Sequence, residues 1–119
     1  MNSPCKIGFL GAGDISLLHA AAIEHCPGAE LAGLWSIDEV LNSEKSERFG
    51  CRIYESAEAL VSDPDVDAVF ILTNLETHCE YGQLAMNTGK HVLIEKPVAV
   101  SVDELITLQA CAEKNGVVL

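Results

Sequence analysis

The sequence predicts an α/β domain with a doubly wound parallel sheet. Short apolar segments alternate with segments of helical periodicity along the whole chain, a pattern typical of strands joined by right-handed crossovers. A glycine-rich turn follows the first apolar segment directly. The length of 119 residues fits one domain, so residues 1–119 are assigned to a single unit.

In the first half of the chain, strands are expected where apolar residues cluster, and helices where they recur every three or four positions. The expected strands are residues 6–10, 30–35 and 51–54. The expected helices run from Ile15 to a stop at Pro27, and over residues 38–49 and 56–61. Gly50 is expected to cap the second of these helices.

The second half continues the alternation. Residues 68–73 are a near-continuous apolar run, which suits a parallel strand covered on both faces. The elements expected after it are a helix over residues 78–87, a strand over 92–94 and a helix over 102–115. Ser101 and Glu104 form a capping box that opens the last helix. Residues 117–119 resemble the start of another strand, which either closes the sheet or leads into more protein.

Composition restricts the partners. Seven Lys and Arg against 18 Asp and Glu give a net charge of -11, so neither nucleic acid nor a membrane surface is an expected partner. The chain lacks a membrane-spanning apolar run and a basic leader segment, which predicts a soluble, cytoplasmic protein. Five scattered cysteines without a C-x-x-C pair argue against a disulfide framework and a zinc site, and each is expected to be buried.

The stretch GAGDIS, residues 11–16, lies between the first strand and the first helix, where the dinucleotide fingerprint requires it. Gly11 permits the tight turn, and Gly13 lets the backbone approach a pyrophosphate at the helix N-terminus. Ser16 replaces the third glycine, and its small side chain still permits close helix packing. We therefore expect dinucleotide binding, with an ordinary tight turn as the alternative.

The fingerprint also requires an acidic residue at the end of the second strand, where it bonds the adenosine ribose. Here that strand ends at Trp35 and Ser36, and the nearest acid is Asp38. Ser36 can bond a ribose hydroxyl or a 2′-phosphate, and Ile37 is not the cation that favours NADP. The sequence therefore leaves both NAD and NADP open as the cofactor.

Three residues, Glu95, Lys96 and Pro97, follow the expected strand of residues 92–94, at the edge where doubly wound sheets bind ligands. Because side chains alternate along a strand, one of the two charged residues is expected to face the crevice. A lysine that is partly desolvated there can have a lowered pKa and can pass a proton to a substrate oxygen. A structural ion pair at the strand end is the alternative.

The stretch GAGDIS, the segment THCEYGQLAMNTGKHVLIEKP and the helix beginning SVDEL together resemble the glucose–fructose oxidoreductase / inositol dehydrogenase / rhizopine catabolism (Gfo/Idh/MocA) family, across essentially the whole chain. The resemblance implies an NAD(P)-dependent oxidoreductase that moves a hydride to or from a sugar, polyol or related hydroxyl or carbonyl compound. It implies a Rossmann domain here and a C-terminal substrate domain that these residues do not contain. The fragment alone is therefore expected to be inactive.

The resemblance also implies roles for individual residues. Lys96 matches the family's catalytic lysine, which contacts the reacting hydroxyl or carbonyl. The implied cofactor-binding residues are Gly11, Gly13, Asp14, Ile15, Ser36, Thr73, Asn74, His78, Glu95 and Pro97. Asn74 and Leu75 stand where the family's T-P-N-x-x-H segment has proline and asparagine. For His78, an exposed position on the helix surface is the alternative.

Two other functions remain open. The chain can be a non-catalytic dinucleotide-binding regulator or sensor, or an interaction domain whose crevice is unused. Lys96 favours the enzyme, because a sensor needs no proton donor at that position. The substrate and the oligomeric state, including a homo-oligomer, also remain open.

Overall fold

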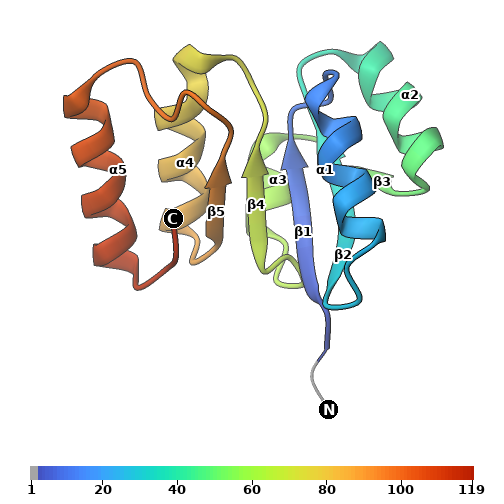
Figure 1. Cartoon of the computed structure of the whole chain (residues 1–119), viewed down its shortest axis with the longest axis horizontal. Helices are drawn as coiled ribbons and strands as arrows, with labels where there is room; N and C mark the ends of the chain where they lie inside the picture. Colours follow the sequence, from blue (N-terminus) through green and yellow to red (C-terminus); the bar gives the residue numbers. More distant parts are fainter. Residues whose placement is uncertain (1–2) are drawn as a thin grey trace.

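A computed structural model gives the fold of residues 3–119, in which five parallel strands form one sheet in the order β3-β2-β1-β4-β5 (Figure 1). The strands are β1 (Cys5–Leu10), β2 (Ala29–Trp35), β3 (Arg52–Ile53), β4 (Ala68–Ile71) and β5 (His91–Ile94). The helices are α1 (Ile15–Glu24), α2 (Glu39–Phe49), α3 (Ala57–Ser62), α4 (His78–Asn87) and α5 (Val102–Asn115), with a 3-10 turn η1 (Leu75–Thr77) before α4. The predicted doubly wound sheet is confirmed.

The helices form a layer on each side of the sheet. Alternate strand residues point to opposite faces, so Phe9 packs in the cluster with residues of α1 and α2, and Leu10 in the cluster with α3, α4 and α5. Both side chains are fully buried. This double cover explains why the strands read as apolar runs rather than as alternating patterns.

The expected strands over residues 117–119 and 68–73 differ most from the structure, and the bounds of the others differ by one residue at one or both ends. Residues 117–119 form no strand, because their contact with β5 is one backbone bond, from the Val92 N–H to the Val118 carbonyl at 2.9 Å, and the Val118 N–H donates to the His91 ring instead of a ladder partner. β4 ends at Ile71, because the neighbouring β1 ends at Leu10 and Gly11 turns the chain away with a φ of 114°.

The cysteines are divided in their burial. Cys79 and Cys111 are buried between helices as expected. Cys51 is half-buried. For Cys5 and Cys26 the expectation of burial is wrong: both are exposed, at the start of β1 and in the turn after α1. No helix among residues 3–119 has the length and apolar character needed to cross a membrane.

Candidate functional site

The carboxyl ends of four strands lie at one edge of the sheet. Leu10 is in register with Trp35 on one side and with Ile71 on the other, and Ile71 is in register with Ile94. The chain turns outward after β1 toward β2 and β3, whereas β4 and β5 lie on the other side of β1 (Figure 1). This is the switch point at which doubly wound sheets bind ligands.

A pocket of about 330 Å³ lies at this edge. Its walls come from the turn after β1, the end of β2 and the loop after β4, with Tyr81 of α4 beside them. The predicted cofactor residues that it brings together are Gly11, Gly13, Ser36, Thr73 and Asn74. Predicted residues from three separate segments of the chain therefore lie around one crevice in the fold.

The first glycine of the turn is required by a close backbone approach. A Cβ at Gly11 would lie 2.6 Å from the carbonyl carbon and oxygen of Leu72 and 3.0 Å from the amide nitrogen of Thr73. The φ of 114° is also a conformation that other residues rarely adopt. Gly11 thus brings the turn against the loop after β4, which sets the width of the crevice.

The second glycine leaves space for a ligand. A Cβ at Gly13 would meet no atom within 4 Å, so this side of the turn is open. Below it, Ser16 is fully buried, and its hydroxyl donates to the Gly13 carbonyl at 2.6 Å. The small third residue therefore allows α1 to pack closely, as the sequence predicts.

The first turn of α1 also fits an anion. The first N–H groups of a helix need partners from outside the helix. In α2, α3 and α5, the side chains of Asp38, Ser56 and Ser101 accept from a backbone N–H of the first turn. α1 has no such side-chain cap at Asp14. A pyrophosphate over Gly13 can serve as the acceptor, so these residues fit a dinucleotide.

Two further predicted residues begin α1. Asp14 is exposed at its N-terminus, and Ile15 is half-buried against the cluster beneath α1. Neither is among the residues lining the pocket of about 330 Å³.

At the adenosine end, the hydroxyl of Ser36 already has a partner. It donates to the Asn42 side-chain oxygen at 2.6 Å, and the Asn42 amide donates back to the Ser36 carbonyl at 2.9 Å. Both residues are buried. Asp38 is exposed and accepts from the Leu41 N–H at 3.1 Å. The sequence analysis did not identify Asn42, because it lies in a helix rich in polar residues, where one more gives no distinct signal.

Farther along the same edge of the sheet, after β5 and outside the lining of this pocket, Glu95 is held by a histidine from α1. The Glu95 Oε2 lies 2.7 Å from the His19 Nε2, and the Glu95 Oε1 accepts from the Lys96 N–H at 3.1 Å. The bond from His19, followed by that from the Lys96 backbone, lowers the pKa of the Glu95 carboxyl from its ordinary value. His19 also signals itself in the sequence, as a polar residue on the apolar stripe of α1.

The environment of Lys96 differs from the expected one. Its side chain is exposed, so the expected partial desolvation is not found, because no residue of the described chain covers it. The alternative is a structural ion pair at this strand end, and the pair found there joins Glu95 to His19 rather than to Lys96. Pro97 is likewise exposed, and the peptide bond between Lys96 and Pro97 is cis.

His78 opens α4 from inside the protein. Only 2% of its surface is exposed, so the alternative of an exposed helix position is wrong. Its Nδ1 lies 2.9 Å from the Pro97 carbonyl oxygen, and its Nε2 lies 3.0 Å from the Thr73 carbonyl oxygen. The ring therefore joins the loop after β4 to the loop after β5.

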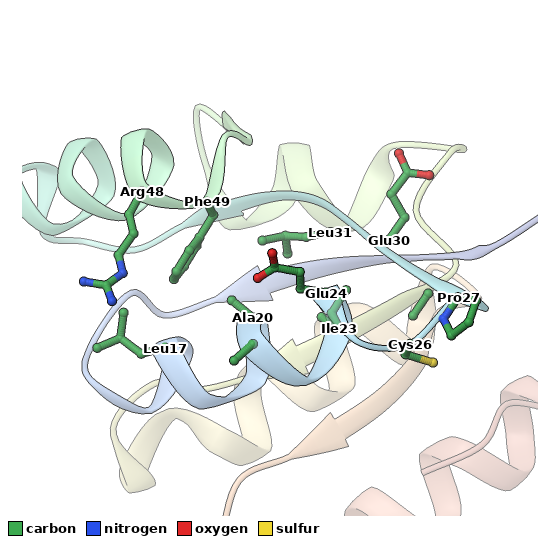
Figure 2. Close-up of a pocket in the computed structure, with 12 residues that line it drawn as sticks. Leu17, Ala20, Ile23, Glu24, Cys26, Pro27, Glu30, Leu31, Arg48 and Phe49 are labelled. Carbon is green, nitrogen blue, oxygen red and sulfur yellow. The ribbon is translucent and has the colours of Figure 1, made fainter.

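A larger hollow of about 640 Å³ lies elsewhere, between α1, α2 and the beginning of β2 (Figure 2). Leu17, Ile23 and Phe49 give it an apolar floor, with Arg48 and Glu24 beside them. None of the predicted site residues lines it. Volume alone therefore does not identify the functional site of this protein.

Known proteins share this architecture. A family model described as "Oxidoreductase family, NAD-binding Rossmann fold" matches residues 5–119. The glucose-6-phosphate 3-dehydrogenase of Bacillus subtilis (strain 168) is 31% identical over 112 residues, which cover 94% of this chain and 31% of that protein.

Two solved structures agree. A 3-ketoreductase from Actinomadura kijaniata in complex with NADP and TDP-benzene has a TM-score of 0.92 at 32% identity, over 98% of this chain and 36% of that one. GenD2 from gentamicin A biosynthesis, in complex with NAD, has a TM-score of 0.94 at 28% identity, over 100% of this chain and 34% of that one. The chain thus spans about a third of the length of these relatives. It belongs to the Gfo/Idh/MocA oxidoreductase family, as an NAD(P)-binding Rossmann domain.

Proposed function

We propose that this chain is the cofactor-binding part of an oxidoreductase that moves a hydride between NAD(P) and a hydroxyl or carbonyl carbon of a sugar, polyol or related compound. One observation carries the proposal. The in-register strand ends place the glycine turn, the loop after β4 and Lys96 along a single edge of the sheet. A cofactor lying along that edge would have its pyrophosphate at Gly13 and its reactive end toward Lys96.

In this proposal each residue has a chemical role. The backbone at Gly13 and Asp14 holds the pyrophosphate, and Thr73 and Asn74 border the middle of the cofactor. When bound, the nicotinamide supplies the hydride acceptor or donor. The exposed amine of Lys96 takes the proton from the substrate hydroxyl during oxidation and returns it to the carbonyl oxygen during reduction.

We also propose that NAD is preferred over NADP. Among the residues that line the pocket of about 330 Å³, Asp38 is the only charged one. A carboxylate there repels a 2′-phosphate, and the Ser36 hydroxyl is occupied by Asn42. The two cations of α2 lie elsewhere: Lys45 is buried with its Nζ 3.1 Å from a Glu44 carboxylate oxygen, and Arg48 lines the hollow between α1 and α2. A ribose with a free hydroxyl fits this environment better.

The substrate is proposed to bind in a second domain, which together with this one makes the active enzyme. The relatives are about three times longer than this chain, which supports the proposal. The exposure of Lys96 supports it too, because a partner domain would supply the cover that a proton-transferring amine needs. The 119 residues alone are expected to bind cofactor and to catalyse nothing.

Fluorescence of Trp35, the single tryptophan, tests cofactor binding. Trp35 lines the pocket, and its ring lies 6.3 Å from that of Tyr81. Titration with NADH and NADPH is expected to quench it and to transfer energy to the reduced nicotinamide, with the lower Kd for NADH. A folded chain that responds to neither cofactor would contradict the proposal, and a lower Kd for NADPH would contradict the preference.

A longer protein that includes the substrate domain tests catalysis. We expect Lys96→Ala to lower kcat by about 10²–10⁴-fold and to leave the Kd for NADH unchanged. A wild-type protein that binds NADH and turns over no sugar or polyol would instead support the non-catalytic sensor.

A further inference from the structure

The two residues that flank Lys96 are each held by a histidine, and the two histidines come from opposite faces of the sheet. His19 lies on α1, and its Nε2 is 2.7 Å from the Glu95 carboxylate. His78 lies on α4, and its Nδ1 is 2.9 Å from the Pro97 carbonyl oxygen. Lys96 therefore projects from a turn that is fastened on both sides.

Aromatic contacts fix the position of the His19 ring. Its ring meets the ring of Phe70 edge to face, with centroids 5.3 Å apart, and that of Phe9 at 6.4 Å. These contacts orient the ring so that Nε2 faces Glu95. The second oxygen of Glu95 accepts from the Lys96 N–H, so His19 acts on the Lys96 backbone through one carboxylate.

His78 lies between two hydrogen-bond acceptors. Both carbonyl oxygens that it faces, those of Thr73 and Pro97, can only accept hydrogen bonds. A ring that carries one N–H therefore donates to one of the two oxygens, and the tautomer decides which of them it is. In either tautomer, the buried ring packs between the end of the Lys96 turn and the loop that lines the cofactor pocket, with each nitrogen within 3.0 Å of a carbonyl oxygen.

We propose that His19 and His78 are positioning residues for Lys96. They hold the turn of residues 95–97 at a fixed distance from the crevice, so that the exposed amine meets the substrate oxygen without cover from its own domain. The inference rests on the proposed role of Lys96. For His78, it assigns a role through the backbone rather than through contact with the cofactor, since both ring nitrogens face backbone carbonyl oxygens.

Backbone dynamics test this in the 119-residue chain without any cofactor. NMR order parameters near 0.85 mark a rigid backbone, and values below about 0.6 a flexible one. We expect the amides of Lys96 and Val98 to be rigid in the wild type and flexible in His19→Leu and in His78→Leu. His19→Gln keeps a donor near Glu95 and is expected to restore rigidity.

Matched readouts separate positioning from general stability. Amides of β1 and β4 are expected to keep their order parameters, and the Kd for NADH is expected to stay within about twofold. If His78→Leu does not fold, His78→Gln, which keeps one donor, replaces it and is expected to loosen the turn partly. Unchanged order at Lys96 in the folded variants, or equal loosening of the whole sheet, would overturn the proposal.

The result is independent of the proposed function. A wild type that binds no NADH would defeat the cofactor proposal, yet the order at Lys96 could still be measured. In the longer protein, His19→Leu is expected to lower kcat at least tenfold with little change in the cofactor KM, and His19→Gln to recover most of it. A change confined to KM would contradict positioning.

Discussion

The glycine turn and the Lys96 turn lie at two places along the same edge of the sheet and are built in different ways. At the glycine turn, residues 11–16 are neighbours in the sequence, and the decisive contact is between backbones, at Gly11 and Leu72. At the Lys96 end, the turn is held by two side chains that lie 76 and 19 positions away from their partners.

This difference predicts different responses to mutation. A backbone contact without free volume cannot adjust, so a single methyl group at Gly11 disturbs the fold itself. A side-chain hydrogen bond can be removed while the fold remains, so changes at the Lys96 end alter local order and chemistry first. The predictions below test this contrast, beginning with the largest effect.

Gly11→Ala is expected to have the largest effect on stability. The new Cβ would lie 2.6 Å from the Leu72 carbonyl, at a φ that disfavours alanine, which predicts a loss of about 2–4 kcal/mol in the free energy of unfolding. Urea denaturation measures it. Gly28→Ala is the matched control, because its Cβ would meet nothing within 4 Å and it lies at the opposite edge of the sheet. Equal losses in both variants would refute the backbone contact.

Gly13→Ala is expected to weaken binding without weakening the fold. The methyl group enters open space in the structure, but occupies the approach of the pyrophosphate. We expect the Kd for NADH to rise by about 10–100-fold, roughly 1.4–2.7 kcal/mol, with Tm close to that of the wild type. Trp35 fluorescence and circular dichroism measure the two quantities. An unchanged Kd would show that the turn is structural only.

Asp38→Asn tests how the negative charge at the adenosine end affects the choice of cofactor. Asparagine caps a helix as well as aspartate, so α2 is expected to keep its stability. Removing the exposed carboxylate is expected to tighten NADPH binding by about 3–10-fold and to change NADH binding little. Parallel titrations measure the ratio of the two Kd values. If that ratio stays constant, Asp38 does not select the cofactor.

Glu95→Gln gives the smallest expected effect, below about 1 kcal/mol in the free energy of unfolding, because the pair with His19 is partly exposed. The pKa of Glu95 is lowered from its ordinary 4.5 in the folded state. The ionised carboxylate therefore stabilises the fold fully at pH values above 4.5. This stabilisation is lost as the pH falls through the folded pKa. The stability gap between wild type and variant is therefore expected to close in acid.

Urea denaturation between pH 7 and the lowest pH at which both proteins fold measures this gap. The Tyr54 hydroxyl, which lowers the pKa of Asp63 through a bond of 2.6 Å, is common to both proteins and cancels in the comparison. A gap that is independent of pH would mean that the carboxylate charge of Glu95 does not contribute.

Much of the site could be predicted because its signals are local. The order of strands and helices follows from periodicity, and Gly11, Gly13 and Ser16 are adjacent to one another in the sequence. The short strands were harder to delimit, since residues 117–119 have strand-like composition but lack a ladder partner. Strand formation depends on a neighbour, which composition does not specify.

The sequence by itself determined the doubly wound sheet, the glycine turn and the place of Lys96 at a strand end, because each depends on residues within one turn or one strand. Only the tertiary structure decided that the Ser36 hydroxyl donates to Asn42, that Glu95 pairs with His19 and that His78 lies between two loops. These are contacts between side chains and distant groups. Their geometry exists only once α1 and α4 have packed on opposite faces of the sheet and brought a histidine to each side of Lys96.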